Sequence, residues 1–195
     1  MAHERFFHTQ NISGDTLTFK NEEHFHLSRV LRKTRGDTVW AIDGEGIAYQ
    51  TRIRSVEKQQ STAEILRRHP GFGEPSNRVS LAVGIIKPSH WEILLEKAVE
   101  LGVHDIFPLH TRYTVKGTIK RERSEKILLS SAKQCGRSRI PRLYPVREFR
   151  EFIRATRNGR QYICDNQENY PRCSRKRSMQ ACPAACRSRG RLPSG

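Results

Sequence analysis

The stretch that decides the fold is residues 79–109, V-S-L-A-V-G-I-I-K-P-S-H-W-E-I-L-L-E-K-A-V-E-L-G-V-H-D-I-F-P-L. Residues 79–86 form a nearly continuous apolar run, which is typical of a strand buried on both faces of a parallel sheet. Apolar side chains then recur at helical spacing over residues 91–101, and residues 105–109 have the pattern of a second strand. A strand, a helix and a strand in this order predict an α/β domain with a parallel sheet.

The ends of the two helices predicted in the α/β domain can be recognised from the sequence. Gly102 directly follows the first helix, and a glycine there can take the left-handed conformation that ends a helix. A second helix is predicted over residues 123–135, and a short basic turn closes it. Pro141 then prevents continuation because it has no backbone N–H. A further strand is predicted at residues 161–164.

The N-terminal part of the chain has a different pattern. Strand-like pieces separated by turn residues surround one predicted helix at residues 22–31, which suggests a compact β-barrel. The predicted strands are residues 16–19, 38–42, 48–56 and 61–66. The Pro- and Gly-rich residues 69–77 indicate a domain boundary. We therefore expect a β-barrel at residues 1–70, an α/β domain at residues 76–165 and a disordered basic tail at residues 166–195.

The chain is strongly basic, because 36 Lys and Arg residues outnumber 20 Asp and Glu residues and give a net charge of +16. Such a charge favours polyanionic partners, nucleic acid first and an anionic membrane surface second, although a generally basic surface would give the same number. No apolar run is long enough to cross a bilayer, and the first residues do not form a signal peptide. The five cysteines lack the paired spacing of a zinc site. We expect no metal, no membrane and a cytoplasmic location.

Basic residues near one face of the predicted N-terminal helix are candidates for RNA contacts. His26, Arg29 and Arg32 follow one another at helical spacing. Their charges could track a phosphate backbone, and each contact would add salt-dependent affinity. An ordinary solvated helix face explains the pattern equally well.

Further basic residues lie in the α/β domain. Arg112 follows the second strand, at a carboxyl end, where open α/β sheets bind ligands. Arg137 and Arg139 stand beside a helix end, where arginines can hold a phosphate or flank a base. The alternative for Arg112 is a solvated loop. The sequence contains no motif that is typical of a catalytic nucleophile.

Two motifs make this sequence similar to a known family. They are E-K-A-V-E-L-G-V at residues 96–103 and Q-C-G-R-S-R-I-P at residues 134–141. In this order and at this separation they resemble the RsmE family of bacterial ribosomal RNA methyltransferases, over about residues 5–165. Lys133 departs from the family, which usually has Glu before the glutamine. Further matching positions include Arg5-Phe6-Phe7, His26, Leu31-Arg32, Lys87 and Thr111-Arg112.

The resemblance implies a PUA-like β-barrel that binds RNA, followed by a SPOUT-type methyltransferase domain that ends in a trefoil knot. It also implies a homodimer that uses S-adenosylmethionine to methylate N3 of a uridine in the 16S rRNA of the small ribosomal subunit. The cofactor site of the family has a G-P-E-G-G segment near the C-terminus, and this sequence lacks it. We therefore expect an incomplete SPOUT domain and assign no cofactor-binding residue.

For such a reaction, a positive group near the uracil would favour the N3 anion. Arg137 and Arg112 are our candidates for this role. Glu100 is a candidate general base, and a structural carboxylate at a helix end is an equally good interpretation. The residues expected to contact RNA are His26, Arg29, Arg32, Lys87 and Arg139.

The tail has an unusual composition. Residues 169–195 show no apolar periodicity and contain no acidic residue. Residues 187–192, R-S-R-G-R-L, permit codons that read G-P-E-G-G-F one base later. We therefore expect a frameshift between about residues 165 and 179, which the nucleotide sequence can test. The alternative function is a non-catalytic RNA-binding protein, made of the barrel and half of the α/β domain.

Overall fold

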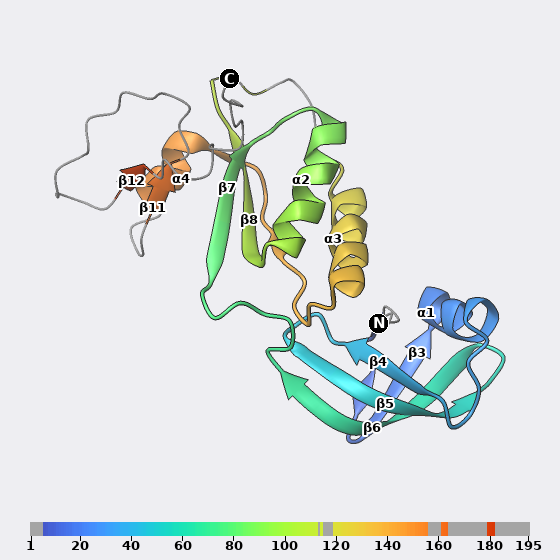
Figure 1. Cartoon of the computed structure of the whole chain (residues 1–195). Helices are drawn as coiled ribbons and strands as arrows, with labels where there is room; N and C mark the ends of the chain where they lie inside the picture. Colours follow the sequence, from blue (N-terminus) through green and yellow to red (C-terminus); the bar gives the residue numbers. More distant parts are fainter. Residues whose placement is uncertain (1–5, 113, 115–118, 156–160, 164–178, 182–195) are drawn as a thin grey trace, which may run out of the picture. The chain divides into compact units, whose positions relative to one another are not determined.

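The chain forms two compact units, Met1–Phe149 and Arg150–Gly195. Figure 1 shows the computed structural model of the chain. The residues that it describes are 6–112, 114, 119–155, 161–163 and 179–181.

The first unit begins with a curled six-stranded sheet, drawn in blue to green in Figure 1. Its strands are β1 (Phe6–His8), β2 (Ile12–Ser13), β3 (Thr16–Lys20), β4 (Thr38–Ile42), β5 (Ile47–Val56) and β6 (Gln60–Pro70). Their order is β1-β4-β5-β6-β3-β2, with β1 parallel to β4 and the other neighbours antiparallel. Along β5, Thr51 and Ile53 are buried while Arg52 and Arg54 are exposed, which is the alternation of a strand with one core face. The predicted barrel is confirmed.

The helix predicted at residues 22–31 consists of two elements. They are an α-helix, α1 (Asn21–Phe25), and a π-helix, η1 (His26–Val30). The buried His24 holds α1 against the sheet, because its Nδ1 lies 2.8 Å from Oγ of Ser61 in β6. Arg32 takes a φ of +50°, a left-handed conformation that ends the helical path.

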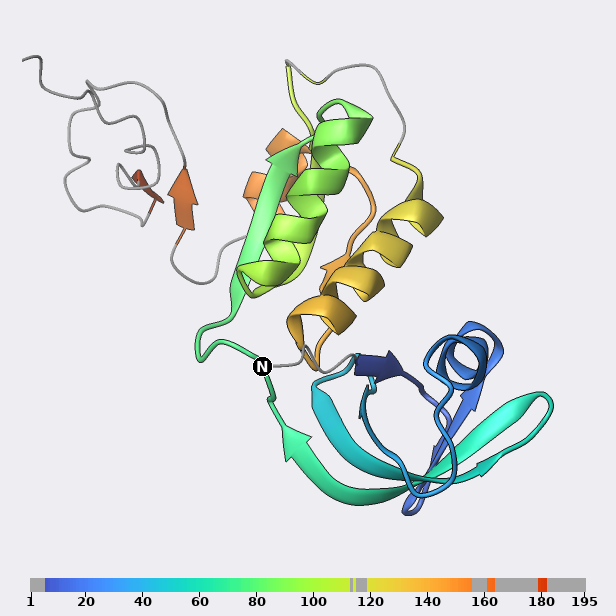
Figure 2. The ribbon, with the colours of Figure 1, turned by 45° about the vertical axis from the view of Figure 1, so that its right-hand side comes forward.

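The α/β half of the first unit follows the connector at residues 71–78. Its elements are β7 (Val79–Gly84), α2 (Pro88–Glu100), β8 (Val103–His110), α3 (Arg121–Cys135), β9 (Arg142–Leu143) and β10 (Arg147–Glu148). All strand pairs in this sheet are parallel, and β8 contacts β7, β9 and β10. Figures 1 and 2 show α2 and α3 side by side, and Trp91 Nε1 donates to Ser124 Oγ between them (3.1 Å). The predicted order of strand, helix and strand is confirmed.

One expectation about this sheet is wrong. Residues 79–86 have the pattern of a strand buried on both faces, but β7 is largely exposed. Val79 is 47% exposed, and Ser80 and Ala82 are exposed as well. The reason is that β7 pairs only with β8 among the described strands. The apolar run therefore identifies the strand without determining its burial.

The barrel and the α/β half share a hydrophobic core. Phe6, Ile42 and Ala48 of the barrel belong to the same buried cluster as Trp91 and Leu95 of α2. A second cluster lies within the barrel alone. Apolar packing therefore crosses the connector, and both halves belong to one unit.

The second unit contains few described elements. α4 (Phe149–Ala155) begins at its border, and β11 (Gln161–Ile163) pairs in parallel with β12 (Met179–Ala181). β11 confirms the strand predicted at residues 161–164. The expected out-of-frame, disordered tail at residues 166–195 lies outside the described residues, except for the three residues of β12, which form a strand.

Candidate functional site

The parallel strands β7 and β8 end side by side, with Gly84 opposite Leu109. The N–H of Ile85 donates to the Leu109 carbonyl (3.1 Å), so the chain leaves both strands at one edge of the sheet. Lys87 precedes α2 at this edge and Arg112 follows β8, and both side chains are exposed. The structure therefore brings these two predicted residues to the same end of the sheet.

A threonine turn fixes the backbone around Arg112. The N–H of Thr111 donates to Thr114 Oγ1 (2.7 Å), and the N–H of Thr114 donates to the Thr111 carbonyl (3.1 Å). Thr111 also packs on Gly84, where an added Cβ would lie 3.4 Å from Thr111 Cγ2. These contacts hold an exposed cation near the carboxyl ends of the two strands.

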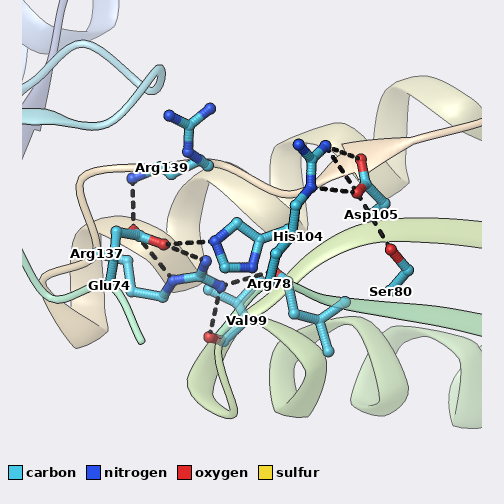
Figure 3. Close-up of polar contacts among 9 residues, drawn as sticks. Glu74, Arg78, Ser80, Val99, His104, Asp105, Arg137 and Arg139 are labelled. Carbon is cyan, nitrogen blue, oxygen red and sulfur yellow. Dashed lines mark hydrogen bonds and ion pairs between the residues drawn. The ribbon is translucent and has the colours of Figure 1, made fainter. Parts of the chain in front are cut away.

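Arg137 lies in the interior, with only 3% of its side chain exposed. Its Nη2 and Nε donate to the carboxylate of Glu74 (2.6 and 3.3 Å). Its Nη1 donates to the carbonyl oxygens of Val99 and Val103 (3.0 and 2.9 Å). Gly136 ends α3 at a φ of +74°, a conformation that suits glycine, and Arg137 follows it. As Figure 3 shows, Arg137 joins the end of α3 to the connector and to α2.

Glu74 is the centre of this polar network (Figure 3). Its Oε1 accepts the backbone N–H of Arg139 (2.9 Å), and its Oε2 lies 3.7 Å from Nε2 of His104. The side chains of Glu74 and His104 are 10% and 13% exposed, and a charge with so little water needs such partners. Sequence reasoning missed both residues, because neither belongs to a motif and the composition of the connector indicates only a boundary.

The structure does not bring the three predicted catalytic residues together. Arg137 contacts Val103, the first residue of β8, whereas Arg112 follows the last one. A strand of this length spans about 23 Å. Glu100 ends α2 near Arg137, but it is exposed and its Oε2 pairs with Nζ of Lys97 (2.7 Å). Arg112 is therefore the member of this set that lies at the carboxyl edge.

Two pKa shifts concern groups near the other end of the sheet. The hydrogen bond to Glu100 raises the pKa of Lys97, which keeps the Lys97 ammonium charged at neutral pH. Partial desolvation raises the pKa of the Cys135 thiol, which disfavours the nucleophilic thiolate. Within the described part of the chain, no group of three His, Cys, Asp or Glu side chains could hold a metal ion. The other four cysteines lie outside the described residues.

Two of the three barrel residues expected to contact RNA are exposed. Arg29 lies in η1, and Arg32 lies two residues after its end. His26 is half-buried, and its ring packs edge-on against Phe7 with the ring centroids 5.8 Å apart. Arg29 and Arg32 are therefore accessible to a phosphate backbone, while His26 also supports the barrel.

Arg139 lies where the barrel meets the α/β half. A Cβ at Gly46 would lie 2.7 Å from Nη2 of Arg139, so the guanidinium covers this glycine of the barrel. The next residue, Ile140, donates its N–H to the Gly44 carbonyl (2.9 Å). Arg139 is half-buried there. This predicted RNA contact is thus also a contact between the two halves.

The described residues at the carboxyl ends of β7 and β8 do not by themselves fit S-adenosylmethionine. This cofactor carries a positive sulfonium, which cations repel, and in Rossmann dinucleotide sites an acidic residue holds the ribose. Residues 84–90 and 109–112 contain no acidic residue, and Lys87 and Arg112 are cations. We therefore assign no residue of this edge to the cofactor.

Comparisons with known proteins match both halves of the chain. The model of the RNA methyltransferase PUA domain matches residues 19–66, and the model of the RNA methyltransferase domain matches residues 73–184. Among the residues that the structure describes, no helix has the length and apolar character needed to span a membrane.

Similar proteins carry the name ribosomal RNA small subunit methyltransferase E. The one from Bacillus subtilis is 27% identical over 144 residues, which cover 71% of this chain and 56% of that protein. The one from Mesomycoplasma hyopneumoniae is 33% identical over 101 residues, which cover 49% of this chain and 44% of that protein. The chain spans about half the length of the curated relatives that it matches.

A solved structure of this kind is that of ribosomal RNA small subunit methyltransferase E from Neisseria gonorrhoeae bound to S-adenosyl methionine. It is 27% identical to this chain, with a TM-score of 0.75, and the match covers 92% of this chain and 77% of that chain.

Proposed function

Because the chain belongs to the RNA methyltransferase family, we propose that it methylates N3 of a uridine in small-subunit ribosomal RNA, with S-adenosylmethionine as the methyl donor. The observation that carries the proposal is the match of the RNA methyltransferase domain to residues 73–184, directly after a PUA domain. The names of the curated relatives support the choice of RNA. The ligand of the Neisseria gonorrhoeae relative supports the choice of donor.

The barrel would bind the RNA backbone. Arg29 and Arg32 are exposed at the end of η1, and each arginine that neutralises a phosphate releases counterions and adds affinity. The net charge of +16 would also attract RNA before contact. We propose that the barrel binds the phosphate backbone of the RNA and that the α/β half binds the uridine that is methylated.

Arg112 and Lys87 are the residues that we assign to the uracil. N3 of uridine carries a proton, and the neutral imide is a poor nucleophile. Loss of that proton to water leaves a negative charge shared with the ring oxygens, and a nearby cation lowers the cost of this charge. The threonine turn holds Arg112 at the strand ends for this purpose. We assign Arg137 a positioning role instead, because its guanidinium is buried against Glu74.

The assembly and location follow from the same resemblance. We propose a homodimer in the cytoplasm, where the small ribosomal subunit is made. Sedimentation of the purified chain would measure its mass, and a monomer at micromolar concentration would contradict the dimer.

A second function, RNA binding without methyl transfer, is favoured by one observation. The described carboxyl edge offers two cations and no acidic partner for the cofactor. An RNA-binding protein needs the cations but not the acidic partner.

Methyl transfer to purified small subunits tests both functions. The full chain is incubated with subunits from a strain that lacks the modification and with methyl-labelled S-adenosylmethionine, and the digested nucleosides are separated. We expect labelled 3-methyluridine, with a lower rate for Arg112→Ala than for Arg54→Ala, a control at an exposed arginine of β5. Subunit binding without label would support the second function, and the absence of both would overturn the two functions together.

A further inference from the structure

A pocket of about 500 Å³ opens between the barrel and the α/β half. One wall is the barrel loop with Gly44 and Glu45, and a second is the segment of residues 140–145. The third wall is one face of α3, formed by Arg121, Glu125 and Leu128 at positions i, i+4 and i+7. The volume lies in the range of small-ligand sites. None of the residues assigned above lines this pocket.

Part of the pocket is apolar. Leu128 and Leu143 are 1% and 8% exposed, and Pro141 is buried beside them. Tyr144 also lines the pocket, and its ring stacks on Phe107 with the centroids 4.3 Å apart. Buried apolar groups next to a fixed aromatic ring suit the flat face of a base, as in proteins that bind single-stranded RNA.

Two arginines lie at the sides of the pocket. Nε of Arg121 bonds Glu125 (2.8 Å), and its Nη2 donates across to the Leu143 carbonyl (3.2 Å). Nη2 of Arg142 lies 3.7 Å from Oε2 of Glu45. The four charged side chains are between 50% and 67% exposed, so water screens both ion pairs and they contribute little. A phosphate can compete for either arginine if the exposed carboxylate of Glu125 or Glu45 turns away from it.

We propose that this pocket binds one nucleotide of a single-stranded segment of the RNA substrate. The base lies against the apolar part, and the flanking phosphates lie at Arg121 and Arg142. Arginine suits this role because its planar guanidinium can pair with two phosphate oxygens. The inference rests on the proposed function, since it takes RNA as the substrate.

The place of the pocket in the fold agrees with this role. Ile140, at one end of its second wall, is bonded to the barrel through the Gly44 carbonyl. The same segment leads to β10, where Arg147 pairs with Leu109 at the carboxyl end of β8. RNA in the pocket would therefore lie between the barrel and the edge that holds Arg112.

Affinity for a fluorescein-labelled single-stranded RNA of ten nucleotides tests the proposal with the full chain. Arg142→Glu reverses a charge at the pocket, and Arg54→Glu is the matched control on the outer face of β5. The two arginines are 63% and 59% exposed, and each pairs with one glutamate in the described structure. We expect about tenfold weaker binding for Arg142→Glu, the order expected for one charged hydrogen bond. The slope of log K against log salt should also fall by about 0.7, the value for one phosphate contact of a single strand.

A second measurement does not depend on charge. RNA that contains 4-thiouridine is cross-linked to the unaltered chain by light, and the modified peptide is identified by mass spectrometry. We expect cross-links within residues 140–145, and we expect Gln10→Trp, which fills part of the pocket, to reduce them. Equal losses of affinity for Arg142→Glu and Arg54→Glu would overturn the proposal that the pocket binds RNA. Cross-links found only outside residues 140–145 would do the same. Neither result would contradict the proposed function. An unaltered chain that binds no RNA would overturn both.

Discussion

The carboxylate of Glu74 and the guanidinium of Arg137 form an ion pair inside the protein, with Oε2 2.6 Å from Nη2. Their side chains are 10% and 3% exposed, so each charge has lost most of its water and depends on the other. Glu74 lies in the connector that follows the barrel, whereas Arg137 follows α3. The pair therefore fastens the connector to the α/β half.

Removal of one partner should be costly. Arg137→Ala is expected to lower the free energy of unfolding by about 3–5 kcal/mol, because the Glu74 carboxylate stays buried without its counter-charge. Urea denaturation followed by circular dichroism measures this loss. The control is Arg139→Ala, since Arg139 bonds Glu74 through its backbone N–H and keeps that bond in the variant. A loss for Arg137→Ala no larger than that of the control would contradict the interpretation.

Two glycines of the connector should respond differently to substitution. Gly71 and Gly73 have φ angles of +67° and +70°, so alanine is strained at both positions. A Cβ at Gly71 meets nothing within 4 Å, whereas a Cβ at Gly73 would lie 2.4 Å from the backbone oxygen of Gly136. We expect Gly71→Ala to cost about 1–2 kcal/mol of stability, which is the backbone term alone.

Gly73→Ala should cost clearly more than Gly71→Ala, because a backbone oxygen cannot move aside without disturbing the end of α3. Thermal unfolding of the two variants gives the comparison. Similar melting temperatures would show that the connector lies farther from Gly136 than the structure places it.

The features that the sequence predicts well, secondary structure and family, depend on patterns of residues that are close together in the chain. The apolar spacing in residues 79–109 predicts a strand, a helix and a strand, and the structure has them. The motifs at residues 96–103 and 134–141 predict the RsmE resemblance, which is confirmed by the names of the curated relatives. The fold expected from that resemblance, a PUA-like barrel before an α/β domain, is confirmed too.

The role of Arg137 could not be predicted in this way. A motif gives the residue type, but the direction of the side chain depends on contacts remote in sequence. Gly136 takes a left-handed conformation just before Arg137, and the partner Glu74 lies 63 residues earlier in the chain. The exposure of β7 is similar, because it depends on which strands pair with it rather than on its own residues.

Stability is expected to fall in acid partly through Glu92. A hydrogen bond from Arg123 of α3 lowers the pKa of the Glu92 carboxyl in the folded chain. The unfolded chain then binds a proton more readily, so the stabilisation is present above the unfolded pKa and is lost as the pH falls through the folded pKa.

Unfolding measured from about pH 7 down to about pH 3 covers the range in which carboxyl groups titrate. Glu92→Gln should lose less stability over this range than the unaltered chain, while Glu96→Gln, on the same helix, serves as the matched control. An equal acid loss in Glu92→Gln and the unaltered chain would contradict a role for the bond between α2 and α3.

The exposed arginines of the barrel should contribute to RNA affinity through phosphate contacts. Arg29→Ala and Arg32→Ala are each expected to reduce the slope of log K against log salt by about 0.7 for single-stranded RNA, because each removes one phosphate contact. The double variant should lose about twice as much, since the two contacts act on separate phosphates. Arg52→Ala is the control, because Arg52 is exposed on β5 of the same barrel. Fluorescence anisotropy at several salt concentrations gives the slopes. If Arg52→Ala lowers the slope as much as Arg29→Ala and Arg32→Ala do, the barrel attracts RNA by its overall charge and not through these two arginines.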